Sequence, residues 1–153
     1  MRAYDGIKAE RGREVTLETP DFLEQARHLL SKNLTVVLRM SGSSMRPAIE
    51  DGDIITVEAL ADEPVRQGDI VLYQSRSDTA VIHRVVRVER ASPDRMVVTR
   101  GDGASQNDSP VSIQRVLGKV KHVERAGERI KIVRPRPTAL ATIRAWLQRL
   151  KFW

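Results

Sequence analysis

The chain of 153 residues contains no cysteine, so it has neither a disulfide framework nor a cysteine nucleophile. A zinc site would have to be built from histidine and carboxylate side chains alone. The three histidines, His28, His83 and His122, share no metal-ligand spacing. The sequence therefore predicts no metal site and no other cofactor.

Long apolar runs are also missing. No run approaches the roughly 18 apolar residues that a membrane-spanning helix needs. Residues 1–10 are charged and lack the apolar centre of a secretory signal. We therefore expect a cytoplasmic protein without a membrane-spanning anchor.

The net charge of +6 is spread unevenly along the chain. Residues 119–153 carry ten Lys or Arg against two Glu, whereas the preceding residues have a slight acidic excess. Such asymmetry is typical of a segment that meets an acidic partner or a membrane surface. Nucleic acid is not expected as a partner, because the basic residues are mixed with apolar ones and no known nucleic-acid-binding module is present.

One helix is predicted near the N-terminus, over residues 19–30. Thr19 is a candidate N-cap, Pro20 suits the first helical position, and Asn33 is a plausible stop. The helix has an apolar stripe at i, i+4, i+7 and i+8. This stripe consists of Phe22, Ala26, Leu29 and Leu30.

The rest of the sequence up to residue 134 alternates short β-branched runs with turn signals. Gly52-Asp53, Gly68-Asp69 and Ala126-Gly127 mark turns, the last one in a hairpin. Many short strands with little helix predict a mainly β, barrel-like domain. The predicted strands are 35–40, 54–57, 70–73, 80–88, 96–99, 116–123 and 130–133.

Three segments follow from this pattern: an N-terminal segment with the helix (1–34), a β domain (35–134) and a basic amphipathic C-terminal helix (135–153). In the C-terminal segment, apolar residues share one face of the expected helix, with two tryptophans beside it. Such a stripe more often packs on its own domain or on a partner protein than on lipid. Peripheral attachment to a membrane surface is the alternative.

The run Ser41-Gly42-Ser43-Ser44-Met45-Arg46-Pro47 is the most informative motif. A small, flexible segment of this kind could present Ser44 at a sharp turn. Downstream lie His83 and two aspartates, Asp102 and Asp108. Serine, histidine and aspartate can act as nucleophile, general base and orienting acid. Each also has an ordinary interpretation, as a turn serine, a core histidine and turn-capping acids.

Three stretches together resemble the signal peptidase family in order and spacing, over residues 36–120. They are SGSSMRP followed by GD, GDIVLY followed by VIHRVV, and TRGDGASQND. The resemblance implies a signal-peptidase/LexA-like fold and Ser44 as nucleophile. Most bacterial members and the LexA-type self-cleaving repressors use a lysine base, but His83 stands at that position here. The chain is therefore similar to the archaeal and endoplasmic-reticulum branch, which uses serine, histidine and aspartate.

The acidic box of that branch reads GDNNxxDD, and here it reads GDGASQND. By position Asp108 would orient His83 and Asp102 would support it, although the departure at Gly103-Ala104 leaves the choice between the two open. Some family members place an oxyanion-binding serine two residues before the nucleophile, where this chain has Gly42. The oxyanion would then rest on backbone N–H groups of the turn at Met45, with Ser41 or Ser43 as helpers.

The sequence thus predicts a serine endopeptidase that cuts a precursor or leader peptide after a small residue. One alternative is a self-cleaving regulatory protein, which the histidine at the base position disfavours. The first 40 residues also contain neither an Ala-Gly nor a Cys-Gly bond, the typical self-cleavage sites. The other alternative is a non-catalytic peptide-binding module with the same fold.

Overall fold

The computed structural model describes residues 4–9, 13–15, 19–90 and 93–132, so the predicted C-terminal helix lies outside the described residues. Within these ranges the fold is mainly β, with one α-helix, α1 (Thr19–Ser31), and one short 3₁₀ helix, η1 (Ile113–Arg115). The strands are β1 (Tyr4–Ala9), β2 (Arg13–Val15), β3 (Val36–Met40), β4 (Ile54–Ala59), β5 (Ile70–Gln74), β6 (Ala80–Arg90), β7 (Arg95–Arg100), β8 (Val111–Ser112), β9 (Val116–Arg125) and β10 (Glu128–Ile130).

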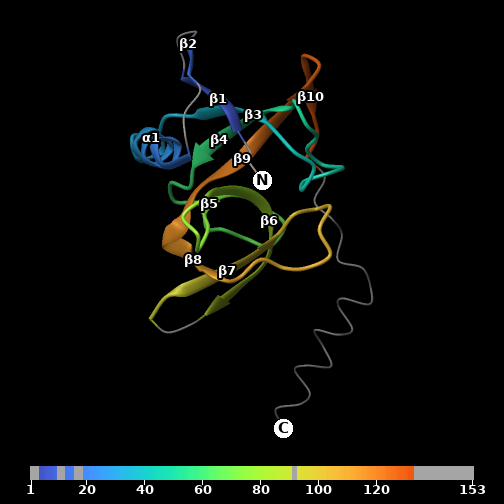
Figure 1. The fold of residues 1–153 in the computed structure, drawn as a ribbon. Helices are drawn as coiled ribbons and strands as arrows, with labels where there is room; N and C mark the ends of the chain where they lie inside the picture. Colours follow the sequence, from blue (N-terminus) through green and yellow to red (C-terminus); the bar gives the residue numbers. More distant parts are fainter. Residues whose placement is uncertain (1–3, 10–12, 16–18, 91–92, 133–153) are drawn as a thin grey trace.

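These strands form one curled antiparallel sheet in the order β2-β1-β3-β4-β9-β5-β6-β7-β8 (Figure 1). The long strand β9 is the centre of this order. It pairs with β4 on one side, and on the other side its first half pairs with β5 and its second half with β10. Such curling lets a single sheet enclose its own apolar side chains.

The predicted N-terminal helix is confirmed as α1, and its apolar stripe packs into the core, with Leu29 only partly buried. Phe22, Ala26 and Leu30 are buried, and Leu23 is buried beside them. The helix ends in a Schellman arrangement, in which Leu34 N donates to Leu29 O at 3.0 Å. Asn33 takes the left-handed conformation there, with φ of 57°, which explains why it ends the helix.

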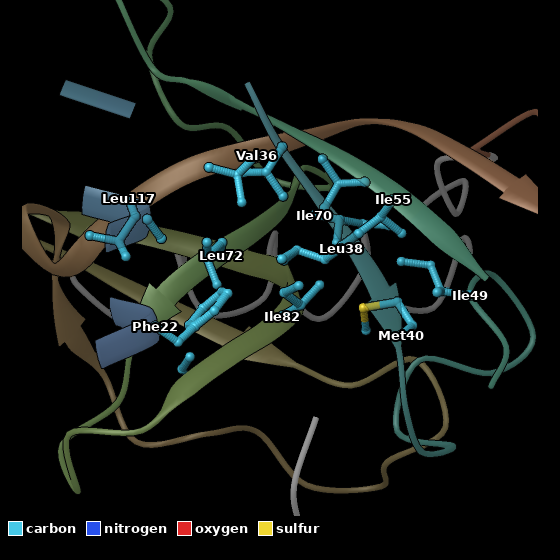
Figure 2. Packing of buried hydrophobic residues seen from close by; sticks show 14 of the residues in the cluster. Phe22, Val36, Leu38, Met40, Ile49, Ile55, Ile70, Leu72, Ile82 and Leu117 are labelled. Atoms are coloured by element: carbon cyan, nitrogen blue, oxygen red, sulfur yellow. The ribbon is translucent and has the colours of Figure 1, made fainter. Parts of the chain in front are cut away.

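The apolar core consists of two clusters. The larger joins α1 to β3, β4, β5 and β9, and Figure 2 shows Met40 and Ile49 at one end of it and Phe22 at the other. The smaller lies between β5, β6 and β7 and includes Val71, Tyr73 and Val97. Alternate residues of β5 therefore face different clusters, and this double burial explains the uninterrupted apolar run of Ile70–Tyr73.

The strands β1 and β2 were not predicted. Their segment is charged and lacks the alternation that marks a half-buried strand. In the structure β1 pairs with β3, for example Lys8 with Val37. Backbone hydrogen bonds to an otherwise open strand edge need no apolar face, so the amino-acid pattern carries no signal for them.

The predicted turns are confirmed. Ala126 and Gly127 have φ of 51° and 81° and join β9 to β10 as a two-residue hairpin. Asp53 Oδ2 accepts from Glu50 N at 2.8 Å, and Asp69 Oδ2 accepts from Arg66 N at 2.9 Å. No helix in the described part of the chain is both long and apolar enough to cross a membrane.

Candidate active site

The loop between β3 and β4, residues 41–53, carries Ser44 and is held from below by apolar side chains. Met45 and Ile49 are 2% and 1% exposed and belong to the larger core cluster. Gly42, with φ of 101°, donates its N–H to Asp51 Oδ1 at 2.8 Å. Ser44, next to Met45, is itself half-buried. The buried neighbours thus fix a serine that stays within reach of solvent.

The base of this loop is closed by an ion pair between a buried aspartate and a partly exposed arginine. Asp53, 2% exposed, accepts two hydrogen bonds from the Arg125 guanidinium, both of 2.9 Å. Arg125 also lies 3.0 Å from Glu50. Burial tends to raise the pKa of Asp53, but Arg125 and the Glu50 N–H outweigh it and lower the pKa below its ordinary value of 3.8. The loop therefore returns to a fixed position at the start of β4.

His83 lies in the first half of β6, paired with Val71 of β5. Its side chain is 15% exposed, and its Nδ1 atom lies 2.7 Å from Asp108 Oδ2. Asp108 comes from residues 101–110, the segment between β7 and β8. The structure thus brings His83 together with Asp108.

The Asp108 carboxylate is ionised and accepts further hydrogen bonds. Thr99 Oγ1 lies 2.7 Å and Tyr73 OH 3.1 Å from the same Oδ2 atom. Burial raises the pKa of Asp108, but the hydrogen bonds with His83, Thr99 and Tyr73 outweigh it and lower the pKa below 3.8. Because an ionised carboxylate only accepts, His83 Nδ1 carries the proton of their bond, and in the neutral imidazole Nε2 holds the lone pair.

The other imidazole nitrogen, Nε2, faces the Ser44 loop across Gly101. A Cβ placed on Gly101 would lie 3.1 Å from His83 Nε2 and 2.5 Å from the Ser44 carbonyl oxygen. The same carbonyl accepts from Gly103 N at 3.0 Å. Within the described residues no hydrogen bond joins Ser44 Oγ to His83. The two loops nevertheless meet at Gly101 with no room for a side chain between them.

Asp102 has a different partner. Arg84 donates to Asp102 through Nε and Nη2, both at 2.7 Å, and through Nη1 to Gly68 O at 2.9 Å. The Arg84 side chain is 7% exposed. The structure therefore separates the two aspartates: Asp108 contacts the histidine, whereas Asp102 neutralises a buried arginine.

The remaining sequence-predicted residues lie around Ser44. Ser41 is half-buried and Ser43 is exposed, with its carbonyl accepting from Arg46 N at 3.2 Å. The Gly42 N–H is committed to Asp51. By contrast, the N–H groups of Ser44 and Met45 make no hydrogen bond in the described part of the chain. These two amides therefore have unused donor capacity within that part of the chain.

Four residues of the site region were missed or given no function by the sequence analysis: Tyr73, Thr99, Arg84 and Arg125. Each lies in a strand whose pattern reads only as apolar or charged. Their contacts depend on which strands become neighbours. His28 is exposed and His122 half-buried. Among the described residues, no three His, Asp or Glu side chains are grouped as a metal site.

Comparison with known proteins defines the class. Residues 3–95 match the Peptidase S24-like family model, so the chain belongs to this family. It is 33% identical to the signal peptidase complex catalytic subunit SEC11C of Homo sapiens over 75 residues, which are 48% of this chain and 38% of that protein. It is likewise 33% identical to signal peptidase I W of Bacillus subtilis over 79 residues, 50% of this chain and 41% of that protein.

A third relative is SEC11 of Lachancea thermotolerans, 33% identical over 85 residues. That match covers 54% of this chain and 49% of the relative. The chain thus spans less than half the length of each of these three relatives. The family match includes Ser44 and His83 and ends before Asp102 and Asp108.

Proposed function

We propose that this chain is a serine endopeptidase resembling signal peptidases, with Ser44 as nucleophile, His83 as general base and Asp108 as the orienting acid. The observation that carries the proposal is the placement of the imidazole. Its Nδ1 lies 2.7 Å from Asp108, and its Nε2 faces the Ser44 loop across Gly101. The family to which the chain belongs and its signal peptidase relatives agree with this activity.

In the proposed reaction, Ser44 Oγ attacks the carbonyl carbon of the scissile bond while its proton passes to His83 Nε2. Asp108 keeps the Nδ1–H tautomer and stabilises the imidazolium that forms. The oxyanion accepts hydrogen bonds from the N–H groups of Ser44 and Met45, which have no partner among the described residues. His83 then returns the proton to the leaving amine, and water releases the acyl group from Ser44 by the reverse path.

The substrate we propose is a precursor or leader peptide cut after a small residue, as the similarity to signal peptidases suggests. The reaction described requires no metal or cofactor. A partner protein or a membrane surface, met through the C-terminal segment, stays a prediction.

The proposal is tested by incubating the purified chain with a defined peptide library and identifying new termini by mass spectrometry. Ser44→Ala is expected to abolish cleavage, whereas Ser105→Ala, an exposed serine of the segment 101–110, leaves it intact. Cleavage by Ser44→Ala at the wild-type rate would contradict the proposal. Discrete fragments of the chain itself, lost in Ser44→Ala, would instead support the self-cleaving alternative.

A further inference from the structure

Three side chains from three neighbouring strands converge on a single oxygen of Asp108. They are His83 of β6 at 2.7 Å, Thr99 of β7 at 2.7 Å and Tyr73 of β5 at 3.1 Å, all measured to Oδ2. The Thr99 and Tyr73 hydroxyls also lie 2.9 Å from each other. The mechanism proposed above uses only the histidine of this group.

Asp108 needs such support because its own segment provides little packing. Residues 103–107 and Ser109 are exposed, and the Asp108 side chain is 29% exposed. Within the described part of the chain, the backbone of this residue is held by the hydrogen bond from Asp108 N to Thr99 O, 2.8 Å long. A carboxylate in a polar loop can rotate about χ1 and χ2 and exchange its partners for water. Something else must therefore fix the carboxylate opposite His83.

The two hydroxyls are well placed to do so. Tyr73 and Thr99 are 2% and 1% exposed, and Tyr73 packs in the smaller core cluster, so their positions are set by the sheet. Buried hydroxyls require partners, and here the ionised acceptor is Asp108. Burial, together with the charge of Asp108, raises the pKa of Tyr73 above its ordinary value of 10.0. Tyr73 therefore keeps its proton and remains a donor at neutral pH.

Counting the available protons shows that the Tyr73 and Thr99 hydroxyls cannot use both of their protons in hydrogen bonds to each other alone. Tyr73 and Thr99 each have one proton, and the ionised carboxylate has none. Three contacts among these groups can therefore use only two protons. If Tyr73 donated to Thr99 alone, Thr99 would still have its own proton to donate to Asp108. If both hydroxyl protons are used in hydrogen bonds among Tyr73, Thr99 and Asp108, at least one of them is therefore donated to the Asp108 carboxylate.

We propose that Tyr73 and Thr99 are positioning residues of the site, whose hydroxyls hold the Asp108 carboxylate in the orientation that faces His83. This inference rests on the proposed peptidase function. Neither residue is expected to touch the substrate; each acts through Asp108 on the imidazole. Losing either hydroxyl should therefore lower the rate of the chemical step without weakening substrate binding.

Steady-state cleavage kinetics test this directly. Tyr73→Phe and Thr99→Val each remove one hydroxyl at nearly constant volume. Each is expected to lower kcat about tenfold, the size typical for losing one hydrogen bond to a charged group, with KM unchanged. Thr99→Ser keeps the hydroxyl and should restore most of kcat. The control Thr56→Val, at a half-buried position of β4, should leave both parameters as in the wild type.

A double-mutant cycle separates positioning from general destabilisation. In an Asp108→Asn background, Tyr73→Phe should lower kcat no further, because the carboxylate through which it acts is gone. Equal effects of Tyr73→Phe in both backgrounds would overturn the proposal. Thermal unfolding of each variant shows whether it is folded at the assay temperature. If Thr99→Val is unfolded at the assay temperature, the kinetics of Tyr73→Phe and Thr99→Ser still test the proposal.

A second readout does not depend on peptidase activity. The Nδ1–H resonance of His83, assigned through its loss in His83→Gln, reports the bond to Asp108 in ¹H–¹⁵N spectra. We expect it to shift or broaden in Tyr73→Phe and Thr99→Val and to stay unchanged in Thr56→Val. An altered resonance without any cleavage by the wild type would refute the peptidase function but support the positioning. Cleavage by the wild type, with the resonance and kcat both unaltered in Tyr73→Phe and Thr99→Val, would support the peptidase function but refute the positioning role.

Discussion

The two segments that meet at the candidate site are held in place by different forces. The Ser44 loop, residues 41–53, is fixed by buried Met45 and Ile49 and by a buried aspartate paired with Arg125. Among the described residues, the segment 101–110 is held by hydrogen bonds and by the Arg84–Asp102 ion pair, and most of its side chains are exposed. Apolar packing thus positions the proposed nucleophile, Ser44, whereas polar bonds position the proposed orienting acid, Asp108. The two segments should therefore respond differently to the truncation of a buried side chain, to an added methyl group at their contact, and to pH.

The largest effect on stability is expected from truncating the apolar support of the Ser44 loop. Met45→Ala should lower the free energy of unfolding by about 3 kcal/mol, because it leaves a cavity beneath the loop. Met96→Ala, at a half-buried position of β7, is the matched control and should cost about 1 kcal/mol. Denaturant unfolding measures both. Equal losses would mean that Met45 has no special part in holding the loop.

The contact between the two segments is tested next. Gly101→Ala places a methyl group 2.5 Å from the Ser44 carbonyl, so one segment must move. A displacement of this size should lower kcat/KM about 100-fold. Gly103→Ala, whose Cβ would lie 3.2 Å from Ser43 O, should cost less. Wild-type kinetics in Gly101→Ala would show that the approach of the two segments does not matter for cleavage.

The ion pair at the base of the Ser44 loop should have a smaller effect. Arg125→Gln leaves the Asp53 carboxylate buried without its main partner. We expect a loss in the free energy of unfolding that exceeds the effect of the control below but is smaller than for a fully buried pair, because Arg125 is 33% exposed. The control Arg87→Gln disrupts an exposed pair with Glu89 and should change stability by less than about 0.5 kcal/mol.

The smallest effect is expected from acid. The pKa of Asp108 is lower in the folded state than its ordinary value of 3.8. Its contribution to the free energy of unfolding is therefore fully present above pH 3.8 and is lost as the pH falls through the lower folded-state pKa. The free energy of unfolding should therefore decline more steeply with acid in the wild type than in Asp108→Asn. Parallel curves for the two proteins would contradict a charged Asp108 at this position.

The sequence predicts the fold better than the contacts of the site. Residues 19–30 and the runs of β-branched residues identify α1 and most strands, because their periodicity reflects burial. The charged segment of β1 carries no such signal. Motif order named Ser44, His83 and both aspartates as candidates, but it left the choice between Asp102 and Asp108 open. That choice depends on Arg84, which takes Asp102, and such pairing follows only from the folded sheet.

The most direct test of the account compares the two aspartates in one cleavage assay. Asp108→Asn removes the acceptor for His83 Nδ1–H and should lower kcat/KM by about 10³ to 10⁴, as expected when the imidazole is held in the wrong tautomer. Asp102→Asn leaves Arg84 without its partner and should act mainly on stability, with kcat/KM within about tenfold of the wild type. A folded Asp102→Asn that loses as much activity as Asp108→Asn, or an Asp108→Asn that cleaves like the wild type, would contradict the assignment of Asp108.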